Sequence, residues 1–363
     1  MNIEAFDYDL PEGRVAQQPS PRREEARLMV IDRSGSPPSE ATFAGLPGFL
    51  RQGDLLVLND TRVLPARLHA RKAGGGRVDL LLLDRDASDA DGRTWRCLLS
   101  TSRGLRPGAR LAVADDLEAE VIAAPAEGAA PVRFACKGGG NGAAPPGTGG
   151  AGSVEEAIRR HGVMPLPPYI HRAPRDPLLA LDRERYQTVY AAHDGAIAAP
   201  TAGLHFTTGL LDDLRRRGLE TAFLTLHVGA GTFRPVRCAA IEDHVVDPER
   251  FRLPEETADA VARCRARRGR VVAVGTTVTR VLEASTREDG EVTPGDGWCD
   301  LVIRPGHRFR AVDALVTNLH LPRSSLLILV AAFAGREQIL DAYREAVRRG
   351  FHFYSYGDAM LIL

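Results

Sequence analysis

A histidine stands between two apolar residues in a turn-forming segment of this chain. His205 lies between Leu204 and Phe206 within residues 199–207, which also contain proline, glycine and two threonines. Loops carried by rigid elements often hold catalytic groups, and imidazole is the side chain whose usual pKa lies nearest neutrality. The segment therefore predicts a catalytic loop. A plain turn with a capping threonine and a packed aromatic ring would use the same residue types.

Two further segments place polar groups at the ends of apolar, strand-like runs. Gly275, Thr276 and Thr277 follow one run, and Asn318 and His320 follow another. In open α/β sheets, ligands bind at the carboxyl ends of strands, near the free N–H groups of the next helix. We expect the first segment to hold a carboxylate, a phosphate or a ribose, or only to cap its helix with Thr277.

Two other features are less specific. Gly229, Gly231 and Thr232 follow a third strand-like run, but no further glycine completes a nucleotide-binding motif. Asp358 precedes a hydrophobic run, where it is either a surface residue or a buried carboxylate with a partner. Neither feature defines a site by itself.

The composition excludes several classes of protein. The five cysteines include no Cys-x-x-Cys pair, and no zinc, P-loop or catalytic-triad spacing is present. No apolar run reaches membrane-spanning length, and the first residues lack the apolar core of a signal peptide. We therefore expect a cytoplasmic protein with reduced thiols, no bound metal and no membrane contact.

The charge of the chain is balanced. The 363 residues are 26% charged with a formal net charge of +0, so a surface that binds nucleic acid must be local. Arginines cluster at 215–217, 263–270 and 348–349, each on or at the end of an expected helix. A solvated helix face is the simpler interpretation, and contact with RNA phosphates is the alternative.

The elements around these segments predict two domains, because the chain is long for a single core. After residue 210, helices ending in glycine alternate with apolar strands, which predicts an α/β layer with a largely parallel sheet. Before that, short strand-like runs without helical periodicity predict a small all-β module. We expect a discontinuous α/β domain at 1–61 and 153–363, an inserted barrel-like domain at 62–137 and a flexible glycine-rich loop at 138–152.

Taken together, these motifs resemble the S-adenosylmethionine:tRNA ribosyltransferase-isomerase family of queuosine biosynthesis. The similar segments span essentially the whole chain, in the family's order: 6–11, 53–63, 164–170, 185–190, 198–207, 226–233, 273–277, 317–318, 320–322 and 354–362. The chain departs from the family pattern at Val245–Val246–Asp247–Pro248, and single differences fall at Leu319, His307 and His352. None of these differences touches the 200–205 or 275–277 segments, so we expect activity to be retained.

The resemblance implies an α/β domain with an inserted β-barrel and a specific reaction. The ribosyl group of S-adenosylmethionine is transferred to 7-aminomethyl-7-deazaguanine at the wobble position of a tRNA with a GUN anticodon, and is isomerised to epoxyqueuosine. Adenine and methionine are released. S-adenosylmethionine is then a consumed substrate rather than a cofactor, and the protein is expected to be a monomer. A methyltransferase using the 229–232 loop and a non-catalytic RNA-binding protein remain as alternatives.

The reaction also suggests roles for residues. The sulfonium makes the hydrogens on the ribose 5′ carbon acidic, so a base must remove one. His205 is the first candidate for this base, followed by His227 and His320, and Asp358 is expected to orient a partner or the substrate amine. The expected substrate-binding residues are Pro200, Thr201, Gly203, Gly229, Gly231, Thr232, Gly275, Thr276, Thr277, Asn318 and Gln187. Tyr169, Tyr186 and Tyr356 are expected either to stack on adenine or the tRNA base, or to lie in the core.

Overall fold

The protein folds into two compact units. A computed structural model describes residues 1–85, 89, 91–101, 104–126, 128–137, 152–173, 175–229, 231, 236 and 238–363. The first unit comprises Met1–Arg62, Pro167–His171 and Arg185–Leu363, and the second comprises Val63–Leu166 and Arg172–Glu184. Apart from Gly152, the expected loop at 138–152 lies outside the described residues.

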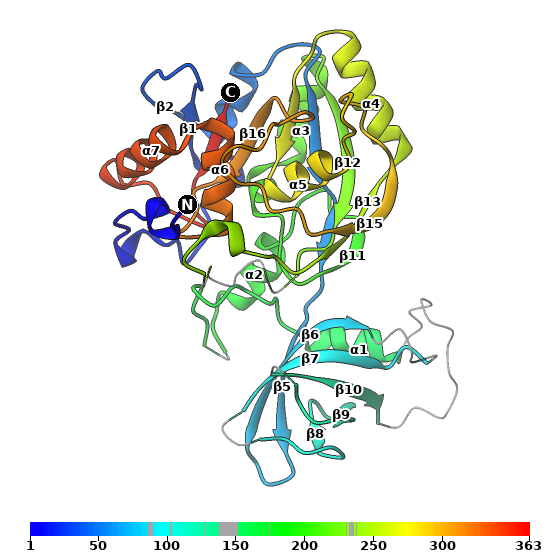
Figure 1. Cartoon of the computed structure of the whole chain (residues 1–363). Helices are drawn as coiled ribbons and strands as arrows, with labels where there is room; N and C mark the ends of the chain where they lie inside the picture. The colour runs from blue at the N-terminus through cyan, green and yellow to red at the C-terminus, as the bar shows by residue number, and fades with distance from the viewer. Residues whose placement is uncertain are drawn as a thin grey trace. The chain divides into compact units, whose positions relative to one another are not determined.

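A nine-stranded mixed sheet forms the centre of the first unit (Figure 1). Its order is β15 (Gly295–Cys299), β13 (Glu249–Leu253), β12 (Glu220–Leu226), β3 (Leu55–Asn59), β14 (Val271–Val274), β16 (Ala314–Asn318), β17 (Ala359–Ile362), β1 (Arg27–Ile31) and β2 (Ser39–Thr42). Outside this sheet, β4 (Thr61–Val63) and β11 (His193–Ala196) pair with each other. The α/β fold class is confirmed.

The expectation of a largely parallel sheet is wrong. Strands β12, β3, β14 and β16 run parallel, as do β17 and β1, but the other neighbours are antiparallel. A single helix between two neighbouring strands brings the chain back in the same direction. Two helices separate β16 from β17, so β17 returns in the opposite direction.

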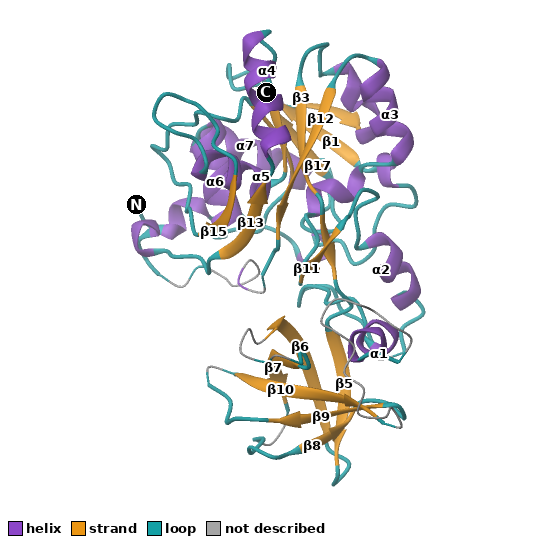
Figure 2. Cartoon of the chain, turned by 90° about the vertical axis from the view of Figure 1, so that its right-hand side faces the viewer, coloured by secondary structure: helices purple, strands orange, loops and turns teal. Residues whose placement is uncertain are grey.

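Helices cover both faces of this sheet. On one face pack α4 (Glu255–Ala266), α5 (Thr276–Ala284), α6 (Ser325–Ala334) and α7 (Arg336–Arg348), and on the other α3 (Thr208–Arg216). Figure 2 shows α3 on the opposite side of the strands from α5, α6 and α7. Alternate residues of β3 point to opposite faces, so Leu55 and Val57 join the first core while Leu56 and Leu58 join the second. Among the described residues, the 3₁₀ helices are Ile3–Phe6, Glu12–Arg14, Arg23–Glu25, Phe43–Gly48, Thr201–His205 and Ile241–Asp243.

The second unit is a closed antiparallel barrel, which confirms the predicted all-β module. Its strands follow the order β10 (Ala129–Cys136), β7 (Thr94–Ser100), β6 (Arg77–Arg85), β5 (Arg67–Lys72), β8 (Arg110–Ala112) and β9 (Leu117–Val121). Two helices accompany it, α1 (Val154–His161) and α2 (Leu179–Arg185).

Helix α1 lies with the barrel rather than with the α/β domain where the sequence analysis placed it. Ser153 caps its N-terminus by accepting a hydrogen bond from the Glu156 N–H at 3.2 Å. Its apolar face contributes Val154, Ala157 and Ile158 to the barrel core. An amphipathic pattern reveals that a helix has a buried face, but not which surface covers it.

No helix in the described part of the chain is long and apolar enough to cross a membrane.

Gly275 makes the turn between β14 and α5 with φ +94° and ψ 156°, a region that side chains other than glycine rarely enter. We therefore expect Gly275→Ala to lower the free energy of unfolding by about 1–3 kcal/mol, measured by urea denaturation. Gly13→Ala is the control, because Gly13 has open space around its Cα. Equal stability of both variants would contradict this account of the turn.

Candidate functional site

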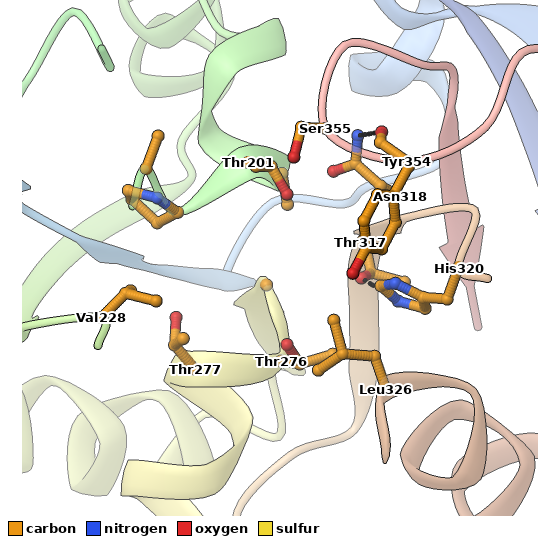
Figure 3. Close-up of a pocket in the computed structure, with 14 residues that line it drawn as sticks. Thr201, Val228, Thr276, Thr277, Thr317, Asn318, His320, Leu326, Tyr354 and Ser355 are labelled. Carbon is orange, nitrogen blue, oxygen red and sulfur yellow. Dashed lines mark hydrogen bonds between the residues drawn. The ribbon is translucent and has the colours of Figure 1, made fainter. Parts of the chain in front are cut away.

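A pocket lies where the carboxyl ends of β14 and β16 meet (Figure 3). Strand pairing places Val274 beside Val316, so the segments that follow both strands start next to each other. Roughly 520 Å³ of space lies between the lining residues, a figure that includes open solvent at the mouth of the pocket. It is lined by Ala199, Pro200, Thr201, Ala202, Val228, Gly275, Thr276, Thr277, Thr317, Asn318, His320, Leu326, Tyr354 and Ser355.

The N-terminus of α5 forms one wall of the pocket. Gly275 is its N-cap residue, and no side chain caps the helix. The interpretation that Thr277 only caps the helix is therefore wrong. Backbone N–H groups at a helix N-terminus favour an anion, so this wall can receive a carboxylate.

Asn59 holds this wall against the sheet. Its Nδ2 donates to the Leu226 carbonyl at 3.0 Å and to the Thr277 hydroxyl at 3.3 Å. Its Oδ1 accepts from the N–H groups of Leu226 and Thr61, each at 3.1 Å. One buried amide thus joins the ends of β3 and β12 to the first turn of α5.

Asn318 and His320 form the opposite wall. Asn318 is 2% exposed, and its Nδ2 donates to the Tyr354 carbonyl at 2.9 Å and meets Nε2 of His205 at 3.2 Å. His320 is also buried, with Nε2 3.0 Å from the Thr317 hydroxyl. Burial lowers the pKa of His320 to about 3, so the imidazole facing the pocket is neutral.

His205 does not line the pocket. It ends the 3₁₀ helix Thr201–His205 and is buried, with its ring centroid 5.1 Å from that of Phe43. Burial, and then the charges of Arg23 and Arg185, lower its pKa to about 3. A base with a pKa near neutrality, as the sequence analysis expected, is therefore absent at this position. Its Nε2 contacts the Asn318 amide, and it is Asn318 that lines the pocket.

The other two catalytic candidates also lie outside the pocket lining. His227 is half-buried, with Nδ1 2.8 Å from the Thr61 hydroxyl, and burial lowers its pKa. Asp358 is buried and accepts hydrogen bonds from the N–H groups of Arg27 and His352 at 2.9 and 2.8 Å. Asp358 is thus the buried, partnered carboxylate of the two alternatives, and it joins β1 to the segment before β17.

Three of the glycines that were expected to bind substrate instead make close contacts with other residues of the protein. Gly203 leaves room for the Tyr190 hydroxyl, with which a Cβ would collide. The Gly229 N–H donates to Glu249 at 2.9 Å, and a Cβ at Gly231 would collide with Asp247. The chain's own carboxylates therefore occupy the described part of this glycine-rich turn. Thr232 lies outside the described residues.

The tyrosines and the glutamine that were expected to contact substrate are not among the residues that line the pocket. The Tyr169 ring packs 4.1 Å from that of Tyr354, and its hydroxyl bonds to Ser355. Tyr186 and Tyr356 are buried and meet edge to face at 5.8 Å. Gln187 is half-buried and is not among the lining residues.

Tyr354 is the aromatic residue on the pocket, and the sequence analysis did not select it. It is buried and has φ +76°, an uncommon conformation for a residue with a side chain. Strained backbone of this kind gathers at functional sites. The signal in the sequence was its place at the start of the 354–362 motif.

The arginine clusters are balanced by acids on their own helices or neighbouring strands. Arg215 pairs with Asp212, while Arg216 and Arg217 pair with Asp213. Arg263 and Arg267 share Glu220, and Arg348 and Arg349 share Glu345. These contacts favour the solvated helix face over a phosphate site. Within the described residues, no group of three or more His, Cys, Asp or Glu side chains could hold a metal ion.

Comparison with known proteins gives a consistent result over the whole chain. The family model described as queuosine biosynthesis protein matches residues 3–362. S-adenosylmethionine:tRNA ribosyltransferase-isomerases of Geobacter metallireducens and Anaeromyxobacter dehalogenans are 49% and 50% identical, over 100% of this chain and 100% and 99% of theirs. The crystal structure of S-adenosylmethionine tRNA ribosyltransferase from Thermotoga maritima is 34% identical, with a TM-score of 0.53, over 99% of this chain and 100% of that one.

The low pKa of His205 has a consequence for stability. Its ordinary value is 6.5, so below that pH the unfolded chain binds a proton that the folded protein, with a pKa of about 3, excludes. Stability is therefore lost as the pH falls from about 6.5 toward about 3, by about 2 kcal/mol at pH 5 for this one residue.

We expect His205→Gln to remove this contribution, so that its free energy of unfolding falls less than that of the wild type between pH 7.5 and pH 5. Urea denaturation at both values measures the difference. Parallel curves for the wild type and His205→Gln would contradict a neutral, buried His205.

Proposed function

The chain belongs to the family of queuosine biosynthesis proteins, and on this premise we propose that it is an S-adenosylmethionine:tRNA ribosyltransferase-isomerase. The reaction transfers the ribosyl group of S-adenosylmethionine to 7-aminomethyl-7-deazaguanine in tRNA and rearranges it to epoxyqueuosine. Adenine and methionine are the other products. The observation that carries the proposal is the pocket, which brings together segments 199–202, 275–277 and 317–320.

The pocket offers groups for both ends of the cosubstrate. The uncapped N-terminus of α5 suits the carboxylate of the methionine moiety. Removal of a hydrogen from the ribose 5′ carbon requires a neutral base, and among the three candidate imidazoles His320 is the one that lines the pocket. His205 and His320 share a pKa of about 3, so the choice between them rests on position: His320 lines the pocket and His205 does not.

The two alternative functions have less support. A methyltransferase would need the 229–232 loop open to a nucleotide, but Glu249 and Asp247 occupy its described residues. A non-catalytic RNA-binding protein would not require a pocket lined by polar residues from several distant segments. Ribosyl transfer accounts for both observations.

We propose that the tRNA backbone binds the barrel at two arginines that have no acidic partner among the described residues, whereas Arg85, Arg96, Arg133 and Arg160 of the same unit pair with acids. Arg71 of β5 pairs directly with Arg77 of β6, both exposed, and neither forms an ion pair with any described residue. Like charges directly opposite each other in a sheet are destabilising, and phosphate would offset that repulsion. As part of the same proposal, the tRNA carries a GUN anticodon and the enzyme is a cytoplasmic monomer.

The reaction has distinctive products. Purified protein incubated with S-adenosylmethionine and tRNA bearing the aminomethyl base should release adenine and methionine in equal amounts, measured by liquid chromatography. Unmodified tRNA is the control and should give neither product. Formation of S-adenosylhomocysteine without adenine would identify a methyltransferase instead.

We expect His320→Gln to lower kcat by about 10²–10⁴-fold, the usual contribution of a general base. Its thermal unfolding should stay close to that of the wild type, because glutamine can still bond to Thr317. The exposed residue His193 supplies the matched control, His193→Gln, with kcat within two-fold of wild type. A near-normal kcat for His320→Gln would exclude His320 as the base.

The barrel prediction compares two pairs of arginines. The double variant Arg71→Gln with Arg77→Gln should weaken tRNA binding. The negative slope of log affinity against log salt concentration should become shallower by roughly one for each phosphate contact that is lost. Arg215→Gln with Arg216→Gln removes the same charge from a surface already balanced by Asp212 and Asp213, and should change affinity less than two-fold. Filter binding across a salt series measures both. Equal effects from the two pairs would remove the barrel from the tRNA surface.

A further inference from the structure

We propose that Asn318 presents a fixed hydrogen-bond acceptor to the substrate and that His205 is a positioning residue that sets its orientation. The inference rests on the proposed function, because it assigns a subsite within the same pocket. The ligand group that it recognises is an N–H or O–H donor.

The orientation of the Asn318 amide follows from its neighbours. The Tyr354 carbonyl oxygen can only accept a hydrogen bond, so the amide nitrogen must face it. The second N–H of that nitrogen points at Nε2 of His205, which must then act as an acceptor. His205 is therefore neutral, with its proton on Nδ1.

Both N–H donors of the Asn318 amide are bonded within the protein, to the Tyr354 carbonyl and to His205. The amide oxygen lies on the other side and faces the pocket. Figure 3 shows the amide nitrogen bonded toward Tyr354 and the oxygen on the other side, toward the space among the lining residues. Oδ1 is buried and has no hydrogen-bond partner among the residues that the structure describes. Buried carbonyl groups without a partner are rare and unfavourable. A donor on the bound substrate would satisfy it.

The same network explains how His205 acts without touching the substrate. Its ring packs against Phe43, and its Nε2 is occupied by the Asn318 amide. Burial and the charges of Arg23 and Arg185 both disfavour a second proton on the ring, which would make it a cation. Protonation of Nε2 would set two donors against each other and release the amide to rotate.

Two substrates carry suitable donors. S-adenosylmethionine has an α-amino group, two ribose hydroxyls and an adenine amino group, and the modified tRNA base has its aminomethyl group. The carboxylate of S-adenosylmethionine has no hydrogen to donate, so it cannot serve as the partner of Oδ1. The shared chemistry is a hydrogen-bond donor, and the kinetics separate the two sources.

The first experiment removes the acceptor. Asn318→Leu should raise KM at least ten-fold, for S-adenosylmethionine if the donor is on the cosubstrate and for tRNA if it is on the base. Thr257→Val is the control, because it deletes a buried hydrogen bond to the Phe223 carbonyl on another element and should leave both KM values unchanged. Unchanged KM and kcat in Asn318→Leu would overturn the proposal.

The second experiment uses binding to the folded wild-type protein. Analogues of S-adenosylmethionine that lack the α-amino group, the 2′-hydroxyl, the 3′-hydroxyl or the adenine amino group are titrated by calorimetry. If one of these groups meets Oδ1, its removal should weaken binding about ten-fold to the wild type and not to Asn318→Leu. Equal losses for both proteins with every analogue, together with an unchanged KM for tRNA, would refute the subsite.

The third experiment separates positioning from proton transfer by His205. Glutamine places an acceptor near the site of Nε2, whereas leucine does not. His205→Gln should keep kcat within about five-fold of wild type, and His205→Leu should raise the same KM as Asn318→Leu. Nitrogen-15 NMR of wild-type His205 should show the proton on Nδ1. A kcat more than 100-fold lower in a folded His205→Gln would instead make His205 the base.

Failure of this inference differs from failure of the proposed function. If the wild type releases no adenine, the reaction assignment falls, while the calorimetric comparison still tests the acceptor. If adenine is released but Asn318→Leu behaves as the wild type, the reaction stands and the subsite does not.

Discussion

The parallel pairing of β14 with β16 is the constraint on which the site depends. Because Val274 lies beside Val316, the turn at Gly275 and the polar residues after Val316 must emerge together at one edge of the sheet. Asn59, at the end of the next strand, ties the first turn of α5 to the same edge. The positions of the pocket walls therefore depend on the register of β3, β14 and β16.

Much of the fold was predictable because its pattern is local. The run that became β3 is buried on both faces and reads as continuous apolar sequence. Strand β5 (Arg67–Lys72) gives a weaker signal, since its polar and apolar residues alternate over only a short run. The direction of β17 and the attachment of α1 to the barrel depend on how distant elements pack. No local pattern contains that information.

The site was predictable to the same extent. Gly275, Thr276, Thr277 and Asn318 were found because polar residues at strand ends have a general reason to meet a ligand. His205 was expected on the pocket and lies one residue behind it, since the sequence does not show that Asn318 stands between them. Tyr354 was passed over because its importance lies in a backbone conformation that residue types do not reveal.

The position of β17 inside the sheet bears on how the protein is made. This strand follows all the others along the chain, yet it pairs with β16 on one side and with β1, formed from some of the earliest residues, on the other. Until the ribosome has delivered it, β1 and β16 lack their shared neighbour and expose unpaired backbone. The Tyr354 carbonyl that orients Asn318 also arrives with this last stretch. The wall of the pocket at Asn318 is therefore completed together with the insertion of the strand between β1 and β16.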